Sequence, residues 1–278
     1  MIYLILAILS SALISVLMRL SKRWTSGGTS LLAANYLMCL ILAGCFTGLE
    51  NLFPQTAGIG KTGLMGAVNG ALALLSFALL QLNVRRNGVV LSAIFMKLGL
   101  LVPMVVAIFV FGELPGAVQV IGFVIAIGAI ILMNLEREES TATFKLGLVL
   151  LLLAGGVGDA MSKVYEELGD AALSEQFLFY TFIAALVFCV ALMLYKKERP
   201  GKAELIFGLL IGVPNYFSFR FLLKSLDDLN AVVVYPTYSV ATIVLVTLAG
   251  VVFFRERLGK RQWIGLAAIL VALVLLNQ

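Results

Sequence analysis

The chain has 278 residues, of which 62% are hydrophobic and only 13% are charged, and its formal net charge is +5. A soluble domain has roughly 45–50% apolar and roughly 25% charged residues, so this chain holds more apolar side chains than a folded interior can bury. The composition excludes a soluble domain and predicts an integral membrane protein, with the lipid bilayer around it and no nucleic-acid partner.

Ten apolar runs follow one another along the chain, each of about 20 residues, the length that a helix needs to cross the hydrocarbon layer. The runs do not alternate as barrel strands would, so they predict an all-α membrane protein. We place the helices at 2–20, 30–49, 63–82, 88–111, 117–135, 145–165, 174–195, 205–224, 230–254 and 261–277. The connections are too short for an appended soluble domain, and no G-x-x-x-x-G-K-[ST] motif implies an ATPase subunit.

Basic residues predict the orientation of these helices. Odd-numbered connections carry fifteen Lys and Arg residues, whereas the even ones carry only Lys61, Lys163 and Lys224. Basic residues stay on the cytoplasmic side of a membrane. We therefore predict a multi-pass protein of the cell (inner) membrane with both termini outside.

The second half of the chain repeats the first. Polar and aromatic residues at matching positions mark the repeat: Asn87 with Asn230, Glu113 with Glu256, Gln119 with Gln262 and Tyr36 with Tyr180. Each half holds five spans, and an odd number sends the second half into the membrane from the opposite side. The sequence thus predicts two inverted five-helix repeats, 1–138 and 139–278, an arrangement typical of secondary transporters.

The ends of the two halves, residues 111–122 and 254–265, read FGELPGAVQVIG and FRERLGKRQWIG. They resemble the "GERL…QWIG" signature of the ten-helix EamA-type members of the drug/metabolite transporter superfamily. The resemblance implies a transporter of small metabolites or drugs with ten spans. Proteins of this type usually have cytoplasmic termini, whereas the charge bias here predicts external ones.

Two cations lie inside predicted spans, where a charge costs about 3 kcal/mol or more and is a functional candidate. Lys97 lies near the midplane of the fourth span, and its repeat counterpart is the uncharged Val240. Arg220 shares one face of the eighth helix with Tyr216. We predict that Lys97, Arg220 and Tyr216 bind substrate.

Uncharged polar side chains extend this predicted site. Asn215 follows a helix-bending proline, Tyr235 and Tyr238 form a polar stripe on the ninth helix, and Asn69 lies in the third span. We expect these four residues to line a substrate cavity, although amides and phenols also serve as plain interhelical hydrogen bonds.

Asp159 is the one acidic residue away from the ends of the predicted spans and the candidate for coupling transport to an ion. Lys163 follows four residues later on the same helical face, which predicts a simple ion pair between the two.

Three further features have structural interpretations. The pairs Gly66 and Gly70, and Gly208 and Gly212, predict close helix contacts within each half. Glu113 and Glu256 lie in loops and are expected to cap helices or pair with basic groups. The chain has no histidine and its three cysteines lie in apolar runs, so we expect no metal site and no cofactor.

These residues favour a secondary transporter that moves a small anionic or zwitterionic metabolite by alternating access, with two cations to hold a carboxylate or phosphate. An exporter of drugs or organic cations is the first alternative, and a lipid-carrier flippase or a non-transporting scaffold the second. An enzyme is not expected, because no catalytic arrangement is evident.

Overall fold

A computed structural model describes residues 1–25, 28–134, 144–255 and 259–278. Every regular element in these ranges is helical, which confirms the predicted all-α class. The helices are α1 (Ile2–Ser21), α2 (Gly28–Thr47), α3 (Ile59–Leu98), α4 (Leu101–Phe109), α5 (Ala117–Asn134), α6 (Lys145–Leu168), α7 (Ser174–Tyr195), α8 (Lys202–Leu226), α9 (Ala231–Phe254) and α10 (Lys260–Leu276), with short 3-10 helices at Leu49–Asn51 and Ala171–Leu173. Seven helices in the described part are long and apolar enough to cross a membrane, so the chain is a multi-pass membrane protein.

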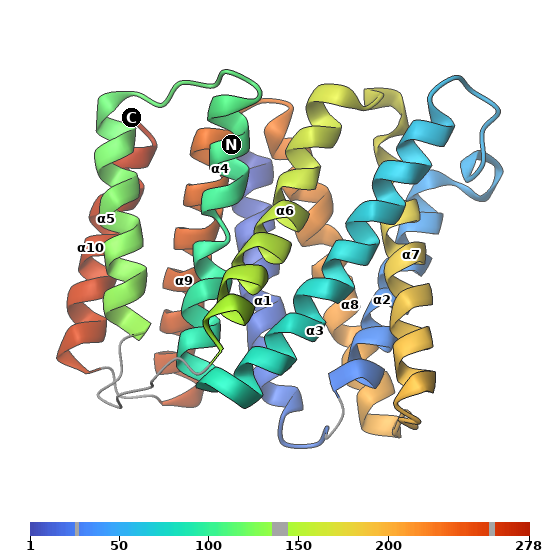
Figure 1. Cartoon of the computed structure of the whole chain (residues 1–278), viewed down its shortest axis with the longest axis horizontal. Coiled ribbons are helices and arrows are strands. Elements are labelled where there is room, and N and C mark those ends of the chain that lie inside the picture. The colour runs from blue at the N-terminus through green and yellow to red at the C-terminus, as the bar shows by residue number, and fades with distance from the viewer. Residues whose placement is uncertain (26–27, 135–143, 256–258) are drawn as a thin grey trace.

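The third and fourth helices depart from their predicted bounds. α3 continues through the expected loop after residue 82, descending obliquely to the lower face before the chain rises into α4 (Figure 1). Its Asn83 amide donates to the Gly147 carbonyl over 2.8 Å, and Asn87 Oδ1 accepts from Phe144 N over 2.8 Å. These residues read as loop residues but instead bind the start of α6. The predicted span 88–111 is interrupted between α3 and α4.

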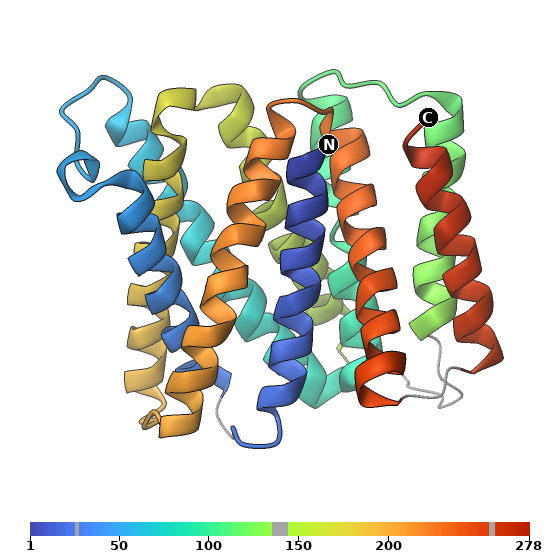
Figure 2. The same ribbon diagram turned by 180° about the vertical axis from the view of Figure 1, so that it is seen from behind.

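Helices of one half pack mainly on helices of the other. α1 and α2 pack on α8, as α6 and α7 pack on α3, and further contacts join α2 with α7, α1 with α9, α4 with α6 and α5 with α10. Figures 1 and 2 show α5 and α10 at one edge of the molecule and α2 and α7 at the other. When each helix is replaced by its counterpart in the other half, α1 by α6 and so on to α5 by α10, the same strongly packed helix pairs result. The inverted repeat itself remains a prediction, and its boundary at 138 lies outside the described residues.

The glycine pairs do make close helix contacts, but the expectation that these lie within each half is wrong. A Cβ atom on Gly70 of α3 would lie 2.7 Å from Ala185 N of α7, and one on Gly208 of α8 would lie 2.6 Å from Leu31 O of α2. The glycines therefore let backbones meet across the two halves.

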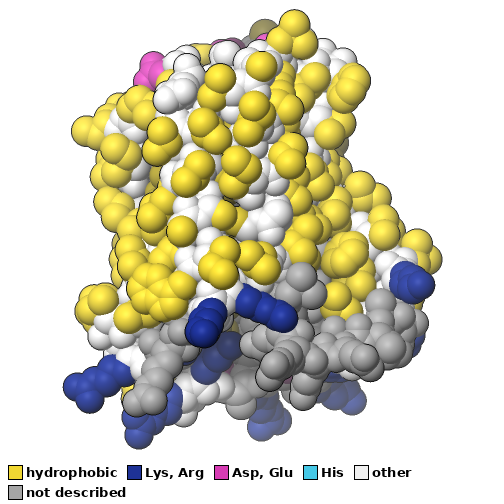
Figure 3. All heavy atoms as spheres, turned by 90° about the vertical axis from the view of Figure 1, so that its left-hand side faces the viewer, with side chains coloured by type: hydrophobic (Ala, Val, Ile, Leu, Met, Phe, Trp, Pro, Cys, Tyr) yellow, Lys and Arg dark blue, Asp and Glu magenta, His cyan; other side chains and the backbone are white. Residues whose placement is uncertain are grey.

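The two faces differ in charge as the positive-inside pattern predicts. Both chain ends lie at the upper face in Figure 1. Figure 3 shows, on the side formed by α5 and α10, a broad apolar band with Lys and Arg side chains gathered along its lower edge. The termini thus lie on the face opposite this basic edge. Glu256, Arg257 and Arg137 are outside the described residues.

Candidate functional site

An acidic cavity of about 330 Å³ lies among α2, α3, α6, α7 and α8. Three predicted site residues, Asn69, Asp159 and Asn215, line it together. The other lining residues are Tyr36, Ala73, Ser76, Met96, Gly155, Gly158, Thr181, Phe182, Ala185 and Phe219. Ser76, Thr181 and Phe182 did not stand out in the sequence, since single hydroxyl and aromatic residues are common in spans.

Asp159 faces this cavity without a partner. Its carboxylate makes no hydrogen bond or ion pair with any described residue, and its side chain is exposed to the cavity. The predicted ion pair with Lys163 is wrong, because Lys163 Nζ lies instead 2.8 Å from Glu113, 2.5 Å from Glu166 and 2.7 Å from Glu167. The cavity therefore carries a free carboxylate.

Two amides complete the polar side of the acidic cavity. Asn69 is 3% exposed, and its Nδ2 atom is buried without a hydrogen-bond partner. Asn215 Nδ2 donates to Asn35 Oδ1 of α2 over 3.2 Å. Asn69 thus offers an unused donor in the same cavity lining as the free carboxylate, and Asn215 is held by α2.

Lys97 lies in a separate, basic cavity of about 270 Å³. Its lining comes from α1, α3, α5, α9 and α10 and consists of Ser15, Lys97, Met133, Thr242, Ile243, Val246, Thr247 and Gln262. Lys97 is in the last turn of α3, just before the helix break at Gly99, where the backbone approaches Gly156 of α6. The Lys97 and Asp159 charges attract each other, but neither a hydrogen bond nor an ion pair joins them.

The two predicted tyrosines of α9 lie near Asp159 but line neither the acidic nor the basic cavity. Tyr235 donates its hydroxyl to the Asp159 carbonyl over 2.9 Å. The Tyr238 and Ser218 hydroxyls are 2.9 Å apart. These contacts tie α9 to α6 and α8 around the acidic cavity.

Arg220 and Tyr216 do not line the acidic cavity and form a cluster with Glu175 of the first turn of α7. Arg220 Nη2 is 2.5 Å from Glu175 Oε1, and the guanidinium lies over the Phe46 ring. The fully buried Tyr216 donates to Glu175 Oε2 over 3.3 Å. The Arg220 charge is therefore neutralised within the protein by Glu175, which no sequence pattern singles out.

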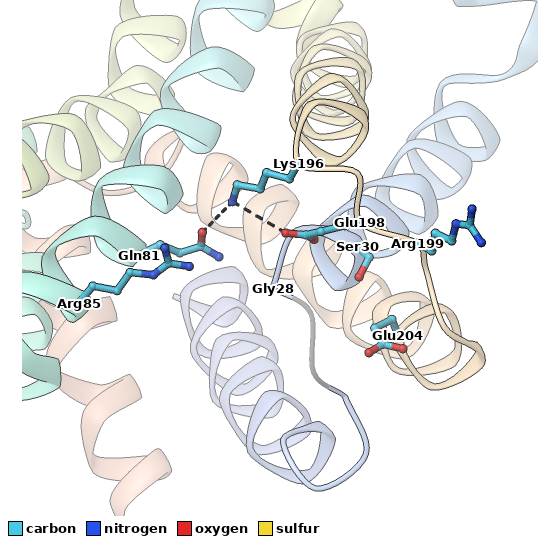
Figure 4. Close-up of a pocket in the computed structure, with 8 residues that line it drawn as sticks. All are labelled: Gly28, Ser30, Gln81, Arg85, Lys196, Glu198, Arg199 and Glu204. Carbon is cyan, nitrogen blue, oxygen red and sulfur yellow. Dashed lines mark hydrogen bonds and ion pairs between the residues drawn. The ribbon is translucent and has the colours of Figure 1, made fainter.

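A third cavity, the lower-face pocket of about 620 Å³, is bordered by the start of α2, the interior of α3, the chain just after α7 and the start of α8. Figure 4 shows Lys196 pointing toward Gln81 and Glu198, while Arg199 points outward. Lys196 Nζ lies 3.0 Å from Gln81 Oε1 and 3.2 Å from the Thr29 hydroxyl. This polar group joins α7 to α2 and α3 below the acidic cavity. In the described part of the chain, no cluster of His, Cys, Asp or Glu is arranged to hold a metal ion.

Comparisons with known proteins agree with this architecture. A sequence model described as the EamA-like transporter family matches residues 145–278. An uncharacterized protein of Haemophilus influenzae is 27% identical over 274 residues, which are 95% of this chain and 93% of that protein. A crystal structure superposes on 99% of this chain and 94% of its own, with a TM-score of 0.79 and 14% sequence identity, so the two proteins share a fold.

Proposed function

Because this chain belongs, through residues 145–278, to the EamA-like transporter family, whose members transport and do not catalyse reactions, we propose that it moves a small zwitterionic, amino-acid-like metabolite across the membrane. The acidic cavity is the proposed binding site. Transport by alternating access is driven by a gradient, either of the substrate itself or of an ion coupled through Asp159.

The observation that carries this proposal is the pairing of a free carboxylate with a free amide donor in one cavity. A substrate ammonium group would bind Asp159, and its carboxylate would accept from Asn69 Nδ2, which otherwise stays buried and unsatisfied. Phe182 and Phe219 offer an apolar surface for the rest of the molecule.

The equivalent packing of the two halves on each other supports alternating access, because two equivalent halves can exchange conformations around a central site. The basic lower face supports a cytoplasmic placement of the lower-face pocket, with both termini outside the cell membrane.

An exporter of organic cations is the second candidate. Asp159 shares its cavity with Tyr36, Phe182 and Phe219, and a carboxylate among aromatic rings also suits a lipophilic cation. The Asn69 donor favours the zwitterion, since a cation without an acceptor would leave it unsatisfied.

Thermal stabilisation of the purified protein separates these candidates. A ligand at about 100 times its Kd adds about 2.7 kcal/mol of apparent stability. We expect zwitterionic amino acids to stabilise wild type, and both Asp159→Asn and Asn69→Leu to lose the response. Asp228→Asn makes the same chemical change in an exposed turn and should respond as wild type. Stabilisation by organic cations that survives Asn69→Leu would replace the proposal with the second candidate.

A further inference from the structure

The basic cavity has a chemistry opposite to that of the acidic cavity. Among the described residues that line it there is no Asp or Glu, and Lys97 is the one ionisable group. The two cavities take neighbouring residues of α3, because Met96 lines one and Lys97 the other. A substrate held at Asp159 therefore leaves the basic cavity unfilled.

The Lys97 ammonium has no partner in this cavity. No described residue makes a hydrogen bond or ion pair with Nζ, and the attraction of Asp159 acts from the neighbouring cavity without contact. An unpaired ammonium group inside a membrane protein is costly, and such groups pair with anions or line ion pathways.

Uncharged donors in the cavity add to the lysine. Thr242 is 4% exposed, and its hydroxyl oxygen is buried with no hydrogen-bond partner. Gln262 Oε1 already accepts from Gly259 N over 2.9 Å, so its amide NH₂ is the group left to bind a ligand. An ammonium, a hydroxyl and an amide NH₂ are all donors, and together they suit an anion.

We propose that the basic cavity binds a small monovalent inorganic anion, such as chloride, separately from the transported substrate. One lysine is balanced by one negative charge. The volume of about 270 Å³ exceeds that of a bare halide, so several waters accompany the ion. A second effect rests on the proposed function. An anion that neutralises Lys97 weakens the attraction between Lys97 and Asp159, so the Asp159 carboxylate binds the substrate ammonium more strongly and the two ligands bind cooperatively.

The test is the thermal midpoint of purified protein, without substrate, in sodium chloride, bromide or nitrate against sodium gluconate at equal ionic strength. We expect a saturable rise of the midpoint with the small anions and a much smaller one with gluconate, whose polyol chain would have to displace the waters that accompany a small ion. Lys97→Met should abolish the rise. Thr242→Val, which keeps the side-chain shape, should raise the half-saturating concentration about tenfold, as expected for one lost hydrogen bond to a charge.

Two control variants are needed. One tests whether loss of any lysine charge changes the anion response, and the other tests whether the anion site is independent of the substrate site. Lys260→Met removes an exposed charge and should leave the anion response intact. Asp159→Asn should keep the anion response while losing the substrate response, so either site can fail alone. Equal midpoints in chloride and gluconate, or an unchanged response in Lys97→Met, would overturn the proposal. A response limited to carboxylate metabolites would also overturn it and assign Lys97 to the substrate site.

Discussion

Lys163 gathers three carboxylates at the upper end of α6 and is itself almost fully buried. Replacing it by Met leaves Glu113, Glu166 and Glu167 to repel one another. Removing one partner of a buried ion pair costs about 3–5 kcal/mol, and the partial exposure of the glutamates places the expected loss near the lower value. Chemical unfolding in detergent would measure it. Lys224→Met, which removes a lysine that lies over the Tyr3 ring, is the control, and an equal loss in both variants would contradict the assignment.

Arg220 is expected to be a structural residue. Arg220→Gln and Glu175→Gln should each lower stability by about 1–2 kcal/mol, while the half-saturating substrate concentration stays within about twofold of wild type. The swapped pair Glu175→Arg with Arg220→Glu should recover part of the stability. A tenfold weaker substrate affinity in Arg220→Gln, with normal stability, would restore its predicted role in binding.

At the scale of single residues, the sequence singled out Asp159, Asn69 and Asn215, which line one cavity, because polar groups inside membrane spans are rare and therefore conspicuous. It missed the ion-pair partners that lie outside the helix of the cation. Glu175 is far from Arg220 in the sequence, and Glu113 belongs to a loop, so no helical spacing relates either one to its cation. For the same reason, the sequence does not reveal that Lys97 and Asp159 line different cavities.

At the scale of helices, the contact of α3 with α7 depends on the absence of a side chain at Gly70. In Gly70→Ala the new methyl group would lie 2.5 Å from Thr181 O and 2.7 Å from Ala185 N, both backbone atoms, so the helices must separate. We expect a loss of about 1–3 kcal/mol by unfolding measurements. Gly128→Ala in α5 meets no atom within 4 Å and should be neutral or stabilising. An unchanged free energy of unfolding in Gly70→Ala would contradict this prediction and show that α3 and α7 can move apart without a loss of stability.

Hydropathy predicted most helix bounds closely because apolar length alone sets them. The region around Asn83 was predicted as a loop, since polar residues between apolar runs normally face water. The structure uses these amides to bind the start of α6, a tertiary contact that no local pattern reveals. The glycine pairs predicted close helix packing, but their spacing does not indicate which helix they contact.

At the scale of the whole molecule, the side of the membrane on which each face lies is testable. In a variant with Cys39, Cys45 and Cys189 replaced by Ala, a cysteine at Gln278 should react with a membrane-impermeant maleimide on intact cells. A cysteine at Lys197, in the basic connection after α7, should react only after the cells are opened. The reverse pattern would place the basic face outside.

The exchange of packing partners between the halves has a consequence for biosynthesis. α1, α2 and α3 find their main neighbours among α6, α7, α8 and α9, which the ribosome makes later. The early helices therefore wait in the lipid as separate insertion products, with their glycine faces uncovered, until translation delivers the later ones. A chain that stops near its middle lacks these packing partners. We expect membrane proteases to degrade such a truncated chain, so that the first half does not accumulate alone.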